Sequence, residues 1–157
     1  MTASRREIVE LWQRAQESLR ATGTLLAAGF PDFAAARAYY ATFYAASALL
    51  LAEGKTFRSH RGAVALIHRD YVRTGRLPLD IGRILSTLSD LRSVGDYGGA
   101  THVSHAEANE AVLEAQQVLE AVRALLPADL GNVAPAGATT PDVGEQGREQ
   151  EQRPTRH

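Results

Sequence analysis

The chain has 157 residues, of which 45% are hydrophobic and 22% charged, a composition typical of a single soluble globular domain. It contains no cysteine, so disulfides, thiolate catalysis and cysteine-ligated zinc are excluded. No apolar run approaches the roughly 18 residues of a membrane span, and the charged N-terminus lacks the apolar core of a secretory signal. We therefore expect a cytoplasmic protein that does not contact a membrane.

Apolar residues recur every three to four positions from residue 5 to residue 28, which predicts a first amphipathic helix ended by Gly29 and Pro31. Asp32 is suitably placed to cap a second helix that ends at Gly54. This second helix carries a regular stripe of alanines and, on another side, an apolar face that includes Tyr40, Phe43 and Tyr44. A helix that is apolar on most sides is expected at the centre of a bundle.

Three further helices follow. Ser59 can cap a third helix that runs to about Arg73, and Pro78 opens a fourth that reaches about Arg92. Residues 93–103 contain three glycines, so we expect a loop there. The run Ser104-His105-Ala106-Glu107 is a capping box that begins a fifth helix, which ends at Pro127.

No segment alternates as a strand does, so the predicted fold is all-α, an antiparallel bundle of four to five helices over residues 4–127. Residues 128–157 are rich in proline and glycine and hold few large apolar side chains. Such a segment cannot bury enough surface to offset the entropy cost of ordering it. We therefore expect a disordered C-terminal tail.

The formal net charge of −1 conceals an uneven distribution. Residues 55–92 contain eight basic and three acidic side chains, whereas residues 93–127 contain one basic and five acidic ones. Sixteen of the seventeen basic residues are arginines, whose planar guanidinium can bind phosphate or carboxylate with two hydrogen bonds. The pattern fits either a site for a polyanion or charge pairing within the molecule or between two copies.

Three separated segments resemble one known family. Residues 37–46 (RAYYATFYAA) look like the second-helix signature of small stand-alone HEPN domains, a name that abbreviates "higher eukaryotes and prokaryotes nucleotide-binding". The run RSHRG at residues 58–62, followed by an apolar helix, resembles the next segment of that family. The run LRSVGDYG at residues 91–98 resembles its Leu-Arg…Asp-Tyr element. The resemblance covers about residues 35–126 and implies a HEPN-like helical bundle.

The resemblance also implies a function. Many HEPN proteins are metal-independent ribonucleases. Each subunit carries an Arg that is followed, after four to six intervening residues, by a His, and the two copies of this motif meet across a homodimer. The Arg stabilises charge on the scissile phosphate, and the His serves as acid or base. Many small prokaryotic members pair with a minimal nucleotidyltransferase as toxin and antitoxin. The implied partners are therefore RNA, a second copy of the chain and a nucleotidyltransferase-family protein.

This sequence departs from the Arg–His motif after Arg92. The positions where the motif places its His hold Tyr97, Gly98 and Gly99, and His102 follows Arg92 only after nine residues. Arg61 and His68 have the motif's spacing, but they lie in the third predicted helix, and we interpret that match as coincidence.

Two sets of candidate residues follow from this comparison. In the catalytic set, one residue holds phosphate and another replaces the missing His; its members are Arg92, Asp96, Tyr97 and His102. The set for nucleotide or RNA binding comprises Arg37, Tyr40, Arg58, His60 and Arg61.

Each set also has a structural interpretation. Arg92 and Asp96 could form an ion pair that holds the turn before the fifth helix, and Tyr97 could be partly packed. Arg37 and Tyr40 could form a buried polar contact, because a buried arginine must be paired. A helix N-terminus with nearby cations attracts phosphate, but the charges at the start of the third helix could equally be solvated.

We expect no metal and no cofactor. His102 and His105 are not accompanied by the Glu-x-x-His pairs of a bundle-type metal site, and no dinucleotide or P-loop motif is present. Two functions remain: an RNA-directed toxin-type or accessory subunit of a HEPN/nucleotidyltransferase module, or a non-catalytic HEPN module that binds a nucleotide, RNA or a protein. The missing His favours the second, and the family context favours the first.

Overall fold

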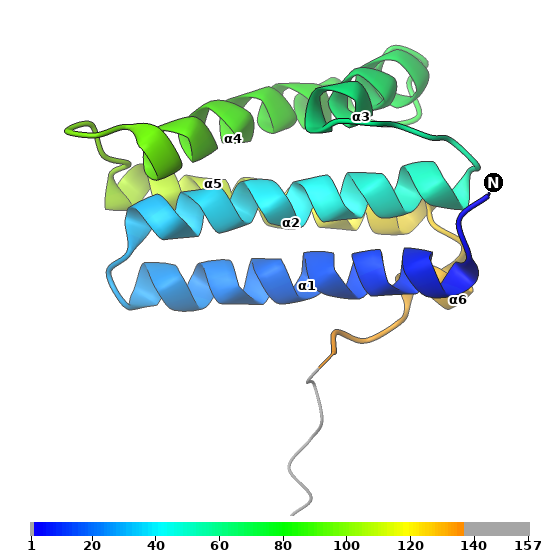
Figure 1. Ribbon diagram of the computed structural model, residues 1–157, viewed down its shortest axis with the longest axis horizontal. Helices are drawn as coiled ribbons and strands as arrows, with labels where there is room; N and C mark the ends of the chain where they lie inside the picture. Colours follow the sequence, from blue (N-terminus) through cyan, green and yellow to red (C-terminus); the bar gives the residue numbers. More distant parts are fainter. Residues whose placement is uncertain (1, 137–157) are drawn as a thin grey trace, which may run out of the picture.

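The computed structural model describes residues 2–136, and these residues form helices without any strand (Figure 1). The expectation of an all-α bundle is confirmed. The elements are α1 (Arg5–Ala27), α2 (Pro31–Ala52), α3 (His60–Ile67), the π-helix η1 (His68–Val72), α4 (Leu79–Tyr97), α5 (His105–Leu125) and the short α6 (Ala128–Gly131).

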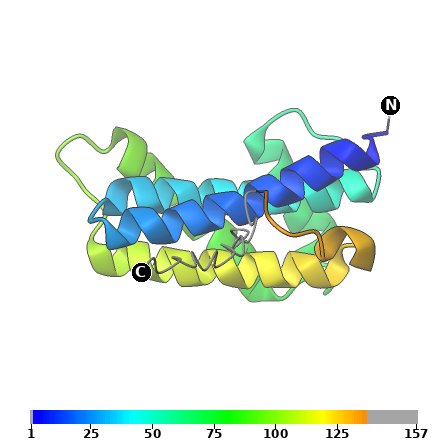
Figure 2. The same cartoon turned by 90° about the horizontal axis from the view of Figure 1, so that it is seen from below.

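Helix α2 is the central element. It contacts α1 on one side, α3 and α4 on the other, and α5 behind it, as Figure 1 and the view from below in Figure 2 show. The alanine stripe of α2 has no exposed surface at positions 34, 38, 41, 45 and 48, as its predicted central place requires. The largest fully buried side chains around it include Trp12, Leu49 and Tyr71.

The cap predicted for α2 was wrong. Pro31 occupies the first position of the helix, and Phe30 precedes it without a side-chain hydrogen bond to the helix. The carboxylate of Asp32 accepts the backbone N–H of Val103 at 2.7 Å and pairs with Nδ1 of His102 at 2.8 Å. Asp32 therefore ties the loop before α5 to the start of α2 instead of capping its own helix.

The predicted end of the fourth helix was also wrong. Helix α4 continues to Tyr97, so Arg92 and Asp96 are helical and the loop spans only residues 98–103. Gly95 does not break the helix, because it lies where α4 touches α2. A Cβ atom on Gly95 would lie 2.5 Å from the carbonyl oxygen of Asp32, so the glycine permits this close approach.

The third helix begins as expected and ends differently. The Ser59 hydroxyl accepts the N–H of Gly62 at 3.0 Å, which confirms the predicted cap. The α geometry stops at Ile67, and a π-helix follows where a continuous α-helix to Arg73 was expected. A single π turn widens the helix locally and redirects the side chains that follow it.

An ion-pair network fastens this π-helix to the end of α2. Arg76 binds both carboxylate oxygens of Glu53 at 2.7 Å, and the buried Tyr71 hydroxyl donates to the same carboxylate at 2.8 Å. The hydrogen bonds from Arg76 lower the pKa of Glu53, and burial raises the pKa of Tyr71. Lys55 and Arg69 both pair with Asp70.

Packing continues past the expected domain end at residue 127. Leu130 of α6 is 6% exposed, and Asp129 pairs with Arg5 at 2.9 Å. The Gln13 side-chain amide donates to the carbonyl oxygen of Ala134 at 3.2 Å. The rest of the expected tail, residues 137–157, lies outside the described residues. Within residues 2–136, no helix is long and apolar enough to cross a membrane.

Candidate functional site

A cavity of about 370 Å³ lies between α2, α3 and α4. It brings together residues from both candidate sets, because Arg92 of α4 lines it together with His60 and Arg61 of α3. The other lining residues are Tyr39, Val64, Leu85, Ser86, Ser89 and Asp90.

Arg92 lies on the aromatic rings of α2. Its guanidinium carbon Cζ is 5.0 Å from the ring centre of Tyr39 and 5.9 Å from that of Tyr40. Cations are attracted to aromatic faces at such distances. The Nε atom of Arg92 is buried and has no hydrogen-bond partner among residues 2–136. Arg92 also forms no ion pair within residues 2–136, so its positive charge is not neutralised by a carboxylate there.

Aromatic side chains of α2 also hold His60 at the start of α3. The His60 ring lies 4.1 Å from the ring centre of Phe43, and 6.2 and 6.1 Å from those of Tyr39 and Tyr40. Tyr39 is only 2% exposed, and burial raises the pKa of its phenol while the Arg92 cation opposes that shift. Tyr39 therefore stays protonated near neutral pH and can serve as a hydrogen-bond donor.

The remaining candidates of the catalytic set lie outside this cavity. Asp96 is exposed at the end of α4, and the expected ion pair between Arg92 and Asp96 is not formed in the described structure. Tyr97 is 79% exposed. His102 is bound to Asp32, so its loop is held against the start of α2.

The remaining binding candidates are also separate. Arg37 lies over the ring of Tyr40, with Cζ 4.7 Å from its centre, so their contact is a cation–π interaction at a half-buried position and not the buried polar contact expected. Arg58 is exposed. His68 packs against Gly82 of α4, where an added Cβ would lie 2.8 Å from its ring, and it does not line the cavity with Arg61.

Sequence reasoning did not select Tyr39 or the cavity residues of α4 that precede Arg92. Positions 85, 89 and 92 follow each other at spacings of four and three, which places them on one helical face. That spacing is the feature of the sequence that could have identified these cavity residues together with Arg92. Tyr39 directly precedes Tyr40, which was selected.

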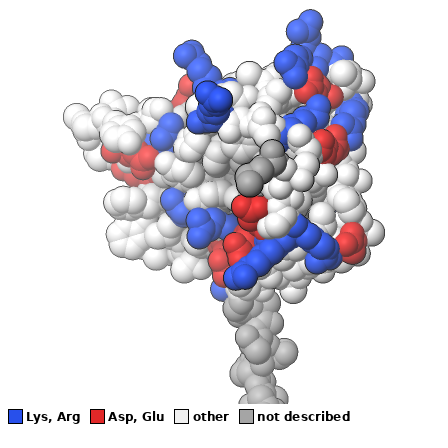
Figure 3. Space-filling view, turned by 45° about the vertical axis from the view of Figure 1, so that its right-hand side comes forward, with Lys and Arg blue, Asp and Glu red and all other residues white. Residues whose placement is uncertain are grey.

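The structure also divides the basic segment. Of the eight basic residues between positions 55 and 92, four form ion pairs: Lys55, Arg69, Arg76 and Arg83. The other four, Arg58, Arg61, Arg73 and Arg92, form none within the described residues. Figure 3 shows Lys and Arg side chains across the upper part of the molecule, the level of α3 and α4 in Figure 1. Charge pairing within the molecule therefore accounts for four of these eight basic residues.

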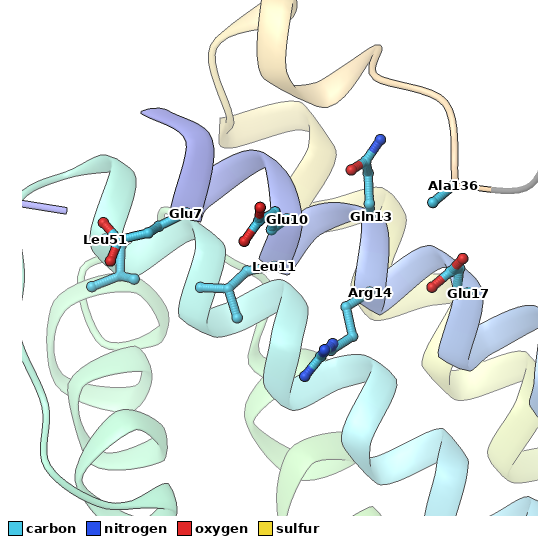
Figure 4. A pocket seen from close by; sticks show the side chains of 8 residues that line it. All are labelled: Glu7, Glu10, Leu11, Gln13, Arg14, Glu17, Leu51 and Ala136. Carbon is cyan, nitrogen blue, oxygen red and sulfur yellow. The ribbon is translucent and has the colours of Figure 1, made fainter. Parts of the chain in front are cut away.

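A second cavity, of about 470 Å³, lies along α1 (Figure 4). Its lining includes the carboxylates of Glu7, Glu10 and Glu17, with Arg14 as its one cation. Glu7 is already engaged in the capping box at the start of α1. This acidic lining opposes the binding of phosphate, so the cavity at Arg92 is the better candidate for an anionic ligand.

Comparison with known proteins assigns the family. The model of the HEPN domain matches residues 8–125. A "UPF0332 protein" of Thermotoga maritima is 34% identical over 121 residues, which cover 76% of this chain and 92% of that protein. "Putative toxin MJ0605" of Methanocaldococcus jannaschii is 31% identical, with 78% of this chain and 90% of that protein covered.

A solved structure has the same fold. The crystal structure of TT1696 from Thermus thermophilus matches with a TM-score of 0.65 at 23% identity, and covers 76% of this chain and 98% of that one. Sequence and fold thus agree over the helices that carry the cavity, and the chain belongs to the HEPN domain family.

Proposed function

We propose that this protein is the RNA-directed, toxin-type subunit of a two-component module, and that it binds RNA in the cavity at Arg92. The observation that carries the proposal is that Arg92 lines the cavity, lies on the ring of Tyr39 and forms no ion pair within the described residues. The relative from Methanocaldococcus jannaschii whose name is "Putative toxin MJ0605" supports the toxin-type role.

The residues around Arg92 match the chemistry of a single RNA strand. Arg92 and Arg61 supply positive charge for a phosphate, and the exposed ring of His60 offers a stacking surface for a base. Asp90 is the one carboxylate in the cavity lining and opposes them. Because the whole chain has a net charge of −1, affinity must come from this local site and not from a general attraction to polyanions.

The experiment is RNA binding by the full chain and its Arg92 variants, measured with a fluorescently labelled single-stranded RNA. Loss of one charge-assisted contact to phosphate is worth about 1.5–3 kcal/mol, so Arg92→Ala should weaken binding by roughly 10-fold to 100-fold. Arg92→Lys keeps the charge but loses the planar group that lies on Tyr39, so it should restore affinity only in part.

The matched control is Arg20→Ala, which removes one positive charge from an exposed position of α1. Its affinity for RNA should equal that of the wild type. If Arg92→Ala binds as well as the control, the cavity is not the RNA site. A melting temperature measured for each variant separates loss of the site from loss of the fold.

We also propose that the chain forms a homodimer and pairs with a nucleotidyltransferase-family protein. The side chains of Tyr40, Phe43, Tyr44 and Leu51 of α2 are only partly buried. A dimer interface over these side chains would bury the apolar surface that they leave exposed. Light scattering at micromolar concentration tests the dimer, and a particle of only 16.9 kDa would contradict it.

The second candidate function is a non-catalytic module that binds RNA, a nucleotide or a protein. The absence of the motif's His after Arg92 favours it, because positions 97–99 hold Tyr and two Gly. RNA that is bound by the purified protein and remains intact during incubation in chelator would support this function.

A further inference from the structure

The polar groups that α4 contributes to the cavity at Arg92 are divided between two edges. The lining residues from this helix are Leu85, Ser86, Ser89, Asp90 and Arg92. Successive residues of an α-helix point about 100° apart, so Asp90 and Arg92 leave α4 in directions about 160° from each other. The other three residues fall between these two directions. The carboxylate and the cation therefore mark opposite edges of the part of the cavity that α4 forms.

The carboxylate of Asp90 is not engaged by the cations of the cavity. Asp90 is exposed and forms no ion pair within residues 2–136, although Arg61 and Arg92 line the same cavity. Residues two positions apart on a helix do not face each other, which explains why Arg92 does not pair with it. Its side chain also forms no hydrogen bond within the described part of the chain. Both carboxylate oxygens are therefore free to accept hydrogen bonds from a ligand.

A carboxylate at this edge is unsuited to the phosphate of an RNA strand. Two negative charges repel each other, so a phosphate is favoured at Arg92 and disfavoured at Asp90. The edge at Asp90 is thus left to the uncharged part of a nucleotide, its base. Between the two edges lie the apolar side chains of Val64 and Leu85, and the exposed ring of His60 is available for stacking. These surfaces suit the flat faces of a base.

We propose that Asp90 recognises a guanine base of the bound RNA. The proposal rests on the proposed function, because it requires RNA in the cavity. An ionised carboxylate only accepts hydrogen bonds, and its two oxygens lie side by side. Guanine is the one standard RNA base that offers two adjacent donors, N1–H and the 2-amino group, on the edge that an unpaired strand exposes. Adenine, cytosine and uracil each offer a single donor group there, beside an acceptor that the carboxylate repels.

In this arrangement, affinity and base preference come from different residues. Arg61 and Arg92 hold phosphate, which every nucleotide of a strand carries, so they supply affinity without sequence preference. Asp90 contacts the edge of one base and supplies the preference. Loss of Arg92 should therefore weaken the binding of every strand by the same factor. Loss of the Asp90 carboxylate should change the ratio of the affinities for strands with and without guanine.

The test compares the affinities of the full-length protein for two labelled single-stranded RNAs of equal length, an oligouridine and the same strand with one central guanine. Two hydrogen bonds to one base edge discriminate against other bases by roughly 5-fold to 150-fold, so the wild type should bind the guanine strand more tightly by a factor in that range. A third strand carries inosine, which keeps N1–H and lacks the 2-amino group. It should lose part of the preference.

Variants assign the preference to one side chain. Asp90→Asn replaces one acceptor oxygen with an amide donor at unchanged size, so it should bind the guanine and uridine strands equally tightly. Asp90→Glu keeps the carboxylate and should keep part of the preference. Arg92→Ala should weaken the binding of both strands and leave their ratio unchanged. The control is Asp80→Asn, the same substitution at an exposed position of α4 outside the cavity, which should keep the wild-type ratio.

The outcomes separate this proposal from the one on which it rests. If the wild type binds both strands equally, or if Asp90→Asn keeps the preference for guanine, the role of Asp90 is refuted and RNA binding at Arg92 stands. If the wild type binds neither strand, the proposed function fails together with it.

A competitor distinguishes a guanine within RNA from a free guanine nucleotide. Guanosine monophosphate should displace the labelled guanine strand only weakly, because it offers a single phosphate to Arg61 and Arg92. Displacement as strong as that by the unlabelled strand would make a free nucleotide the ligand and would overturn the assignment to RNA.

Discussion

Replacing Gly95 with alanine should loosen the contact between α4 and α2. Alanine is favoured over glycine inside a helix by about 1 kcal/mol, so most such changes stabilise. At position 95, however, the added Cβ would lie 2.5 Å from the carbonyl oxygen of Asp32, which belongs to the backbone of α2. A side chain could rotate away from such a collision, whereas the backbone of a packed helix can only shift as a whole.

Overpacking of this kind costs about 1–3 kcal/mol or more when the neighbour cannot move. After the gain in helix propensity of about 1 kcal/mol is subtracted, the free energy of unfolding should fall by up to about 2 kcal/mol. In a protein of this size, 1 kcal/mol corresponds to about 2–4 °C, so the melting temperature should fall by up to roughly 8 °C. Because Arg92 lies one helical turn before Gly95, RNA binding should weaken as well.

Two other glycines provide matched controls for the same substitution. Gly23 lies inside α1, and a Cβ there would meet nothing within 4 Å, so Gly23→Ala should raise the melting temperature by about 2–4 °C. At Gly82 the added Cβ meets the ring of His68, a side chain that can move, so its effect should lie between the other two. If Gly95→Ala is as stable as Gly23→Ala in thermal denaturation, the close contact does not constrain the two helices and this reasoning is wrong.

Three further predictions follow from contacts outside the site. Deleting residues 128–157 removes the buried leucine of α6, so the free energy of unfolding should fall by about 1.5–3 kcal/mol. Deleting only residues 137–157 should leave the melting temperature measured by calorimetry unchanged. If both deletions gave the same melting temperature, α6 would add nothing to stability. Arg76 lowers the pKa of Glu53 in the folded protein. The stability that this ion pair contributes is therefore fully present at pH values above about 4.3, the ordinary pKa of Glu, and is lost as the pH falls through the folded-state pKa. In Glu53→Gln, the melting temperature should therefore fall less steeply at acid pH than in the wild type. An equally steep fall would contradict this. Asp32→Ala should speed hydrogen exchange in the loop of residues 98–103, and unchanged exchange would mean that other contacts hold it.

The sequence predicted the helices well where two local signals agreed. The starts of α3 and α5 carry both a capping serine and an apolar stripe, and both caps are present in the structure. Apolar periodicity and the Gly-Phe-Pro run placed the end of α1 within one residue. Local chemistry decides such boundaries, because the cap and the first turn involve only near neighbours in the chain.

The glycines after Arg92 misled the prediction because a helical glycine and a loop glycine look alike in sequence. The helical place of Gly95 depends on the approach of α2, a contact between residues more than sixty positions apart in the chain. Gly99, four residues later, does form the turn, with a φ of +59°. The residue type is the same in both cases, and only the distant contact separates them.

The candidate site could be predicted only in part, for the same reason. Arg92, His60 and Arg61 were selected from separate motifs, but their meeting in one cavity depends on how α3 and α4 pack on α2. The sequence motif concerns only residues within a few positions of Arg92. In a bundle, any helix that reaches the cavity can contribute side chains to it.

The environment of Arg92 argues against a purely structural role for that residue. An arginine kept only for stability is expected to pair with a carboxylate once it is buried. Asp96 lies four positions later on the same helix, where such a pair forms readily, and the described structure does not form it. The guanidinium instead lies against two tyrosine rings, with one buried nitrogen unsatisfied and a cavity in front of it. This arrangement leaves the cation available to an anion, as the proposed binding of RNA in the cavity requires.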